Sequence, residues 1–367
     1  MQTMKLTIAR GELLESLGVV TKALSSRTTL PILSGILFTA AGEGVVLQST
    51  DLEISIKDTV AANVEDPGSV VLPGRLLAEV VRSLPEAAVK IETKTFDQVS
   101  ITCGTSAFML RALSPEDFPR FPEVSPDRKF AIQTSVLQSL TRKVAKAVSR
   151  DEARPILTGV LMVVDGQTMR LVATDSYRLA VAEDQLPEVA ADRIDIVVPG
   201  KALEEIPKLA GGTEQVLMGI ADNQIVFEFG HSVYVTRRIE GTFPNYRQLV
   251  PQDGETKLTV SRAGLEEAAK RVSLLAQHNA PLRLKITEST LTLSAQTQDV
   301  GEATEDLMVS TIGEGLEIAF NHAFLVDGVT SSDDEDLEFL ASSPLKPGVL
   351  RSIDGKSYTY LIMPVRP

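Results

Sequence analysis

Apolar and polar residues alternate along many short segments of this chain, and longer segments with a different spacing separate them. Segment 44–60, for example, places apolar residues at Val46, Ile54 and Ile56, the two-residue period of half-buried strands. Three other segments have the three-to-four-residue apolar spacing of amphipathic helices, namely 11–25, 135–149 and 262–275. Helices and short strands mixed in this way predict an α+β fold.

The same order of elements occurs three times. Lys5 begins the run Lys-Leu-Thr-Ile, which returns as Lys-Phe-Ala-Ile at Lys129 and as Lys-Leu-Thr-Val at Lys257. The run Pro-Ile-Leu-Ser-Gly at Pro31 returns as Pro-Ile-Leu-Thr-Gly at Pro155. Matches in constant order and at nearly constant spacing indicate internal triplication. We expect three tandem domains, each a doubled strand–helix–strands unit, with the bounds 1–127, 128–254 and 255–367.

Composition narrows the class of protein. The 367 residues include 36 Lys and Arg, 49 Asp and Glu and a single cysteine, for a formal net charge of −13. Hydrophobic residues at 43% and charged residues at 23% are typical of a globular protein. The lone Cys103 excludes a disulfide within the chain and most cysteine-ligated zinc sites. The start lacks a signal-peptide pattern and no apolar run is long enough for a membrane span, so we expect a cytoplasmic protein with no membrane partner.

Positive charge gathers in one segment despite the acidic total. Residues 134–150 include Arg142, Lys143, Lys146 and Arg150 and no acidic residue. On a helix the last three of these cations share one stripe and the apolar residues form another, so we expect the cations to face solvent. Such a stripe suits sequence-independent contacts with phosphates. The alternative is a solvated helix face without a partner.

Few residues suggest catalysis. Asp51 with Glu53, and Asp175, could hold a metal ion in a nuclease, but Asp51 and Asp175 occupy equivalent positions in two repeats. A recurring Asp is more typical of a turn, where its carboxylate accepts hydrogen bonds from backbone N–H groups. The Gly-Lys-Ser run around Lys356 lacks the earlier glycine of a phosphate-binding loop and predicts a hairpin turn. We therefore predict no catalytic residue, no metal and no cofactor.

Four runs resemble one known family. They begin at Thr29 (Thr-Leu-Pro-Ile-Leu-Ser-Gly), Ala173 (Ala-Thr-Asp-Ser-Tyr-Arg-Leu-Ala), Gly241 (Gly-Thr-Phe-Pro-Asn-Tyr-Arg) and Leu361 (Leu-Ile-Met-Pro-Val-Arg). Together with the triple repeat, they make the whole chain similar to the bacterial sliding clamps, the beta subunits of DNA polymerase III. The resemblance implies that two chains join head to tail as a homodimer in a closed ring, with helices lining the hole and sheets outside.

The resemblance also implies a function without catalysis. Such a clamp encircles double-stranded DNA without sequence preference and acts as a processivity factor in DNA replication. Its partners would be the DNA polymerase III alpha subunit, other polymerases, repair proteins and a clamp loader. These partners carry short peptides, roughly Gln-Leu-x-Leu-Phe, that enter an apolar groove between the second and third domains. A clamp paralogue that serves repair or inhibitor resistance is an alternative that the sequence leaves open.

The resemblance, carried over residue by residue, together with the charge pattern, implies three sets of site residues. The groove would be formed by Leu157, Thr174, Tyr177, Arg178, Leu179, Pro244, Leu249, Asn321, Phe324, Leu361, Ile362, Met363, Pro364, Val365 and Arg366. The cations that face DNA would be Arg27, Arg75, Arg82, Lys143, Lys146, Arg150, Arg154, Lys201 and Lys208. The dimer interface would include Phe108, Leu274 and Leu275. The chain has Ser176-Tyr177 where the family usually has Gly-His, and Gln248 where it usually has Arg, so we expect a different peptide preference.

Overall fold

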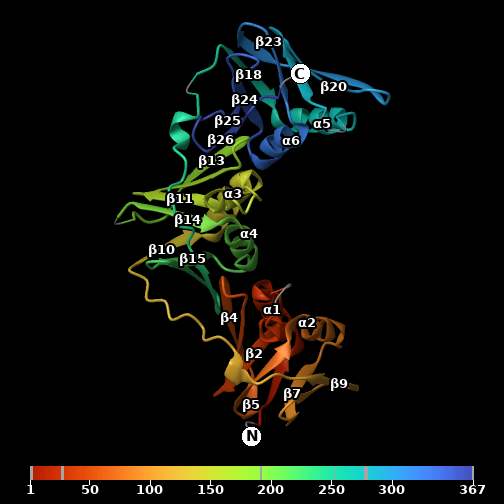
Figure 1. The fold of residues 1–367 in the computed structure, drawn as a ribbon, viewed down its shortest axis with the longest axis vertical. Helices are drawn as coiled ribbons and strands as arrows, with labels where there is room; N and C mark the ends of the chain where they lie inside the picture. Colours follow the sequence, from red (N-terminus) through yellow and green to blue (C-terminus); the bar gives the residue numbers. More distant parts are fainter. Residues whose placement is uncertain (1–2, 26–28, 191, 252, 277–279, 366–367) are drawn as a thin grey trace. The chain divides into compact units, whose positions relative to one another are not determined.

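The chain forms two compact units that do not coincide with its three repeats. The computed structural model describes residues 3–25, 29–190, 192–251, 253–276 and 280–365 (Figure 1). The first unit comprises Met1–Thr134 and Leu209–Arg238, and the second comprises Ser135–Lys208 and Ile239–Pro367. The middle repeat therefore contributes to both units.

Among the described residues, the first unit contains two antiparallel sheets and two α-helices. The five-stranded sheet has the spatial order β5 (Asn63–Asp66), β1 (Lys5–Ala9), β7 (Ala88–Thr95), β8 (Gln98–Cys103) and β9 (Ser106–Arg111). The eight-stranded sheet has the order β10 (Arg128–Gln133), β15 (Gln215–Ile220), β16 (Gln224–Phe229), β17 (Ser232–Arg237), β4 (Ile54–Ala61), β3 (Gly44–Thr50), β2 (Gly35–Ala41) and β6 (Gly68–Pro73). Helices α1 (Arg10–Val20) and α2 (Gly74–Ser83) pack against each other and against the strands.

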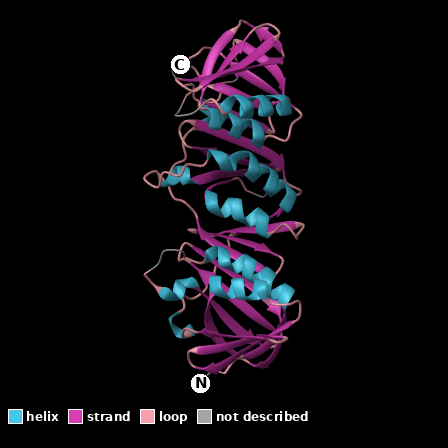
Figure 2. Cartoon of the chain, turned by 90° about the vertical axis from the view of Figure 1, so that its right-hand side faces the viewer, coloured by secondary structure: helices cyan, strands magenta, loops and turns pink. Residues whose placement is uncertain are grey.

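The second unit repeats this plan with four helices. Its nine-stranded sheet has the order β14 (Ile194–Pro199), β11 (Gly159–Asp165), β12 (Thr168–Thr174), β13 (Arg178–Gln185), β26 (Tyr358–Ile362), β25 (Gly348–Ser352), β24 (Asp336–Ala341), β18 (Thr256–Ser261) and β22 (Ser310–Gly313). Its four-stranded sheet has the order β21 (Gly301–Met308), β20 (Thr290–Thr297), β19 (Leu282–Ile286) and β23 (Leu316–Phe320). The helices are α3 (Thr134–Val144), α4 (Gly200–Leu209), α5 (Arg262–Ser273) and α6 (His322–Ser331). In each unit, taken by itself, the helices cover one face of the strands (Figure 2).

The core lies between the helices and the sheets. On α1, Leu13, Leu17 and Val20 are fully buried, and the helix contacts β3 and β4. Burying each such side chain contributes roughly 1.5–3 kcal/mol, so the apolar stripe of the helix, more than its intrinsic propensity, holds it in place. Along β3, buried and half-buried residues alternate, as the two-residue period predicts.

Two strand pairs connect the repeats. In the first junction, β17 of the middle repeat pairs with β4 of the first repeat, and Tyr234 lies opposite Ile56. In the second junction, β26 of the third repeat pairs with β13 of the middle repeat, and Tyr360 lies opposite Ala180. The positions in these two pairs correspond, since Ile56 and Ala180 are 124 residues apart and Tyr234 and Tyr360 are 126 apart, the spacings of the sequence repeat. Sheets thus continue across the repeat boundaries.

Two of the predicted helices end earlier than their sequence pattern indicated. The first, predicted to extend to residue 25, ends at Val20 and is followed by a 3₁₀ turn over Thr21–Ala23. The second ends at Val144 and is followed by a 3₁₀ turn over Ala145–Ala147. A 3₁₀ turn advances about 120° per residue instead of about 100°, so it changes which side chains share a face after the α-helix ends. The third, α5, matches its predicted range to within two residues.

Candidate functional site

Two side chains fix the turn between β12 and β13. Asp175 Oδ1 accepts hydrogen bonds from the backbone N–H groups of Tyr177 (2.9 Å) and Arg178 (3.0 Å). Thr174 Oγ1 donates to the Arg178 carbonyl oxygen at 2.7 Å. At the equivalent turn between β3 and β4, Asp51 Oδ1 accepts the same two backbone bonds. These bonds confirm the turn interpretation of the recurring Asp. The described residues contain no cluster of three or more His, Cys, Asp or Glu side chains that could hold a metal ion.

A left-handed residue follows the Asp in each of these turns. The backbone φ is +77° at Leu52 and +79° at Ser176, and Asp299 in the third repeat has φ +63°. Glycine adopts this conformation at lower cost than any other residue. Ser176 occupies the position where the resemblance implies a glycine, and its positive φ is one that glycine adopts readily, so the departure lies in the side chain.

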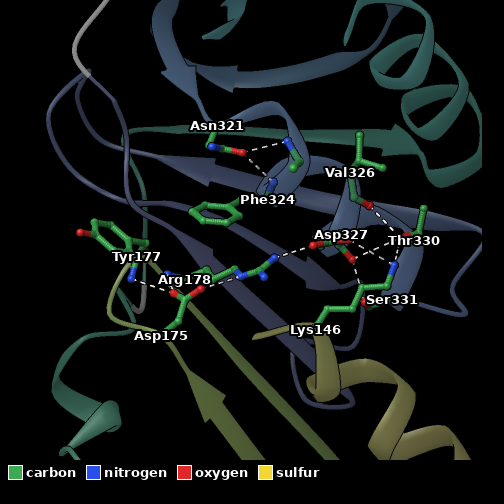
Figure 3. A network of polar contacts seen from close by, with 12 residues as sticks. Lys146, Asp175, Tyr177, Arg178, Asn321, Phe324, Val326, Asp327, Thr330 and Ser331 are labelled. Atoms are coloured by element: carbon green, nitrogen blue, oxygen red, sulfur yellow. Dashed lines mark hydrogen bonds and ion pairs between the residues drawn. The ribbon is translucent and has the colours of Figure 1, made fainter. Parts of the chain in front are cut away.

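Arg178 is the centre of a charged network that links the middle and third repeats (Figure 3). Its Nε donates to Asp175 Oδ2 at 3.0 Å, and its Nη1 donates to Asp327 Oδ2 at 2.6 Å and to the Tyr360 hydroxyl at 3.3 Å. Its guanidinium carbon lies 4.3 Å from the centroid of the Phe324 ring, a cation–π contact. Burial alone would lower the pKa of Arg178, but Tyr360, Asp327 and Asp175 outweigh it and raise that pKa above its ordinary value. Arg178 therefore stays charged.

The N-terminal cap of α6 sets the position of Phe324. Asn321 Oδ1 accepts hydrogen bonds from the backbone N–H groups of Ala323 (2.9 Å) and Phe324 (3.2 Å). This cap satisfies two backbone donors that a helix start would otherwise leave without partners. Asn321 and Phe324, both predicted as groove residues, are thus brought next to Arg178 (Figure 3).

Cations of the basic segment bind acids of the third repeat. Lys146 Nζ lies 3.4 Å from Asp327 Oδ1 and donates to Thr330 Oγ1 at 2.6 Å. Arg142 forms an ion pair with Asp333. Lys143 is only 8% exposed, so the prediction that Lys143, Lys146 and Arg150 share one solvent-facing helical stripe is wrong. Lys143 lies within α3, three residues after the buried Leu140 and next to the buried Val144, so it borders the apolar face of the helix. The 3₁₀ turn over Ala145–Ala147 changes which later residues share a face with it.

The remaining predicted cations lie at the surface. Six of them are exposed, namely Arg75 and Arg82 on α2, Arg150, Arg154, and Lys201 and Lys208 on α4. Arg154 is held in place, since its Nε binds Asp151 Oδ2 at 2.9 Å and its Nη1 donates to Ser176 Oγ at 2.9 Å. Arg27 lies outside the described residues. Whether any of these cations meets DNA stays a prediction.

A cleft of about 1240 Å³ brings the two predicted sites together within the second unit. Its walls come from α3, α4, the start of α6 and the β12–β13 turn. The lining includes six cations, which are Arg142, Lys146, Arg150, Arg154, Arg178 and Lys208. It also includes Tyr177 and Phe324 from the predicted groove, and four acids, which are Asp151, Asp175, Glu204 and Asp327. Basic side chains thus border the predicted groove on one side.

The apolar part of the predicted groove lies on the opposite face of the same strands. Leu179 and Leu361 are directly opposite each other on β13 and β26, and they belong to one buried cluster with Val172, Tyr246 and Val349. Phe243 and Val250 of the segment between the repeats pack against this cluster. Leu157, Thr174 and Ile362 are also buried. Leu179 and Leu361 thus share one face, whereas Ile362, which pairs with Arg178, lies on the other, and these predicted groove residues are buried core.

Several other predicted groove residues are exposed at the surface. Tyr177 is 62% exposed, Leu249 53% and Met363 40%, and Pro244 is also exposed. Backbone bonds hold the end of the chain beside them, from Met363 N–H to the Tyr177 carbonyl oxygen (2.8 Å) and from Val365 N–H to the Ala319 carbonyl oxygen (2.9 Å). Pro364 and Val365 are half-buried, and Arg366 lies outside the described residues. Large exposed apolar side chains next to an apolar cluster are typical of a ligand-binding surface.

The three predicted interface residues lie at sheet edges or beside them. Phe108 is on β9, the edge strand of the five-stranded sheet, and is 36% exposed. Leu274 follows α5 and is 69% exposed, and Leu275 is half-buried. Leu275 lies near Gly301 at the start of β21, because a Cβ added to that glycine would be 3.5 Å from Leu275 Cδ1. β21 is an edge strand of the four-stranded sheet.

Sequence reasoning missed Asp327 and Asp333, the acids that bind the basic segment. Asp327 lies 149 residues from Arg178 and 181 from Lys146, so no local pattern connects them. The available signal was the helical spacing of α6, where Asp327 follows Phe324 by three residues and therefore lies on the same side.

Comparisons with known proteins agree over the whole chain. Family models of the DNA polymerase III beta subunit match the N-terminal domain at residues 4–122, the central domain at 131–245 and the C-terminal domain at 247–366. The beta sliding clamp of Staphylococcus aureus strain Mu50 is 34% identical over 375 residues, which cover 99% of both chains. Among the described residues, no helix is long and apolar enough to cross a membrane.

Solved structures give the same result. The DNA polymerase sliding clamp of Bacillus subtilis superposes with a TM-score of 0.94 at 31% identity, over 99% of each chain. The beta sliding clamp of C. crescentus superposes with a TM-score of 0.94 at 32% identity, over 100% of this chain and 99% of the other.

Proposed function

Because this chain belongs to the DNA polymerase III beta subunit family, we propose that it is a DNA sliding clamp, which closes into a two-subunit ring around duplex DNA and tethers polymerases to it. Its function is then topological, and no catalytic residue, metal or cofactor takes part. It acts on the chromosome, so we expect it in the cytoplasm.

The pattern of strand pairing is the single observation that supports a ring. The fourth strand of the first repeat, β4, pairs with the last strand of the second, β17, and the fourth strand of the second, β13, pairs with the last strand of the third, β26. Two strands in the corresponding positions remain at sheet edges, β21 of the third repeat and β9 of the first. Pairing β9 of one chain with β21 of a second chain repeats the same junction and, done twice, closes a ring of two chains.

The two observed junctions also predict the register of the third. Ile56 and Ala180 each lie four residues after a left-handed turn residue, Leu52 and Ser176 respectively. The left-handed residue of the third repeat is Asp299, and the residue four positions after it is Ala303. Tyr234 and Tyr360 correspond by the 126-residue repeat to Phe108. Phe108 of one chain should therefore lie opposite Ala303 of the other, close to Leu275. This arrangement supports the predicted interface of Phe108, Leu274 and Leu275.

Contacts with DNA would be weak and electrostatic. We assign them to exposed cations on the helices and the loops beside them, namely Arg75, Arg82, Lys146, Arg150, Arg154, Lys201 and Lys208. Such contacts release counterions and weaken steeply with salt, and they carry no sequence information. A ring that holds DNA by topology needs no more, since weak contacts allow sliding.

Partner proteins would bind the groove at the second junction. The buried floor of Leu179 and Leu361, with exposed Leu249, Met363 and Tyr177 around it, suits the apolar side chains of a Gln-Leu-x-Leu-Phe peptide. We expect the polymerase III alpha subunit, other polymerases, repair proteins and the clamp loader to share this groove. Deletion of residues 363–367 should abolish binding of such a peptide while the protein stays dimeric; unchanged affinity would remove the groove assignment.

Retention on closed DNA tests the function directly. The clamp is loaded on nicked circular DNA by the clamp loader of the same bacterium with ATP, and the circle is then cut once. We expect the clamp to remain on the circle during gel filtration in 0.5 M NaCl and to leave when the circle is linearised. Equal retention on circular and linear DNA would contradict a ring.

A further inference from the structure

A second pocket, of about 320 Å³, lies at the second junction on the sheet face that the segment 243–251 crosses. Its walls include Arg170 on β12, Glu183 on β13, Arg351 on β25 and Lys356 in the β25–β26 turn. Tyr246, Arg247, Val250 and Pro251 close it from the side of the segment between the repeats. Neither the DNA contacts nor the apolar groove uses these charged residues.

The pocket is rich in positive charge although the protein is acidic. Four cations and one carboxylate line it. Arg170 binds Glu183 through Nε at 2.8 Å and Nη2 at 2.5 Å, and Arg351 binds Glu338. In the part of the chain that the structure describes, no carboxylate lies within ion-pair distance of Arg247 or Lys356, both of which are exposed. These two cations can take an additional anionic group.

The turn that carries Lys356 is firmly held. Asp354 Oδ1 accepts hydrogen bonds from the backbone N–H groups of Lys356 (2.8 Å) and Ser357 (3.1 Å) and from the Ser352 hydroxyl. The Ser352 bond first, and these backbone bonds with it, lower the pKa of Asp354 to about 2. A lowered carboxyl pKa stabilises the fold above its unfolded value of about 3.9 and loses that effect only as pH falls through about 2, so the turn is intact at neutral pH.

The pocket is continuous with the floor of the apolar groove. Tyr246, which is 8% exposed, belongs to the buried cluster with Leu179 and Leu361 and also lines the pocket. Val181 lines the pocket two residues after Leu179 on the same face of β13, a distance of roughly 7 Å along the strand. A peptide with its apolar anchor on Leu179 and Leu361 would therefore place neighbouring residues within reach of the cations.

The charge is particular to this junction. At the first junction, the position of Arg170 is held by Val46, 124 residues earlier. Arg351 pairs with the residue before Tyr360, and Glu228 pairs with the residue before Tyr234. Because Tyr360 and Tyr234 are equivalent, Glu228 occupies the position of Arg351 at the first junction. The duplicated backbone therefore does not by itself require these cations.

We propose that this cationic pocket binds acidic side chains flanking the apolar motif of a clamp-binding peptide, so that one peptide occupies the groove and the pocket together. The proposal rests on the proposed groove. Charge complementarity argues for it, since carboxylates in a flank would meet Arg247 and Lys356 without displacing the ion pairs of Arg170 and Arg351. The flank would supply specificity, because a lysine there would be repelled.

Fluorescence anisotropy with labelled peptides tests the proposal. The core Gln-Leu-Ser-Leu-Phe is flanked on the N-terminal or the C-terminal side by Asp-Glu, by Asn-Gln or by Lys-Lys. We expect Asp-Glu on one side to tighten binding about fivefold over Asn-Gln in 50 mM NaCl and about twofold or less in 500 mM NaCl. The variant R247Q/K356Q should lose this gain and keep its affinity for the Asn-Gln peptide. The variant K94Q/K285Q, which removes two exposed lysines outside the pocket, should keep it.

The outcomes separate the pocket from the groove. If the core peptide binds and neither flank changes its affinity, the pocket proposal is overturned and the groove stands. If no peptide binds and deletion of residues 363–367 changes nothing, the groove assignment is wrong, and the pocket proposal, which rests on it, is overturned as well. If R247Q/K356Q leaves the flank effect intact but weakens retention on DNA, the pocket binds nucleic acid and the proposal is overturned.

Discussion

The two junctions between repeats have the same backbone and different side chains. In both, an Asp and a Thr fix the preceding turn, and strands pair with equivalent partners. Leu179, Leu361 and Met363 at the second junction correspond to Ser55, Val235 and Arg237 at the first. The first junction accordingly holds a small pocket of about 130 Å³ with a mixed lining, in which polar and charged residues outnumber the apolar ones, whereas the second has a buried apolar cluster.

The comparison teaches that the same strand pairing accommodates different side chains at the two junctions. The strand pairing that builds a continuous sheet depends on backbone hydrogen bonds and tolerates Ser or Leu at one position. The proposed binding of an apolar peptide would depend on the side chains, and of the two described junctions the second has the apolar set Leu179, Leu361 and Met363. One groove per chain is therefore expected, although the chain contains two junctions.

The network around Arg178 should give the largest difference between the junctions. At the first junction, Ile54 occupies the position of Arg178, so that junction has no charged network at this position. Because the Arg178 side chain is only 12% exposed, R178A should remove its ion pairs with Asp175 and Asp327, leave Asp327 with Lys146 alone, and lower the free energy of unfolding by about 3 kcal/mol. R154A, which removes an exposed ion pair, should cost less than about 1 kcal/mol. Urea denaturation measures both, and equal costs would contradict the network's role.

The turn aspartates should differ by a smaller amount. D51A removes two bonds to backbone N–H groups and should cost about 1 kcal/mol, whereas D175A also removes the ion pair with Arg178 and should cost about 2 kcal/mol. Thermal unfolding at a fixed pH compares the two variants. A larger loss for D51A would show that the two turns are not equivalent.

Exchange of one residue between the junctions should change peptide binding. M363R places the residue of the first junction in the groove and should weaken binding of a Gln-Leu-Ser-Leu-Phe peptide by about tenfold or more, because a charged group replaces an apolar contact. The reverse change, R237M, should create no second site, since Ser55 remains polar. Isothermal titration calorimetry gives affinity and stoichiometry, and two peptides per chain in R237M would refute this explanation.

The left-handed turn residues should give the smallest effect. L52G should stabilise the protein by about 0.5–1 kcal/mol, because glycine adopts positive φ without a Cβ clash. S176G should stabilise the protein less than L52G, since it also removes the hydroxyl that accepts a hydrogen bond from Arg154. Differential scanning calorimetry of the two variants, beside the unchanged protein, measures this difference; a larger gain for S176G would contradict it.

The sequence predicted the repeat, the fold class and the turn role of Asp51 and Asp175, because these depend on local spacing. It did not predict the burial of Lys143, because helical spacing alone does not show how far packing covers a residue that borders the apolar face of Leu140 and Val144. Nor did it predict that Lys146 binds Asp327, a contact between residues 181 apart. Periodicity describes one element, and a contact between repeats depends on how two elements meet.

A cross-link at the third junction tests the ring most directly. Cysteines in F108C/A303C should lie opposite each other across two chains, within reach of a disulfide, whereas M109C/A303C places one cysteine on the other face of its strand. The native Cys103 is buried and serves as background in both. We expect F108C/A303C to migrate as a covalent dimer after mild oxidation on a non-reducing denaturing gel, with little dimer from M109C/A303C. A monomer from both variants, or equal dimer from both, would contradict the closed ring.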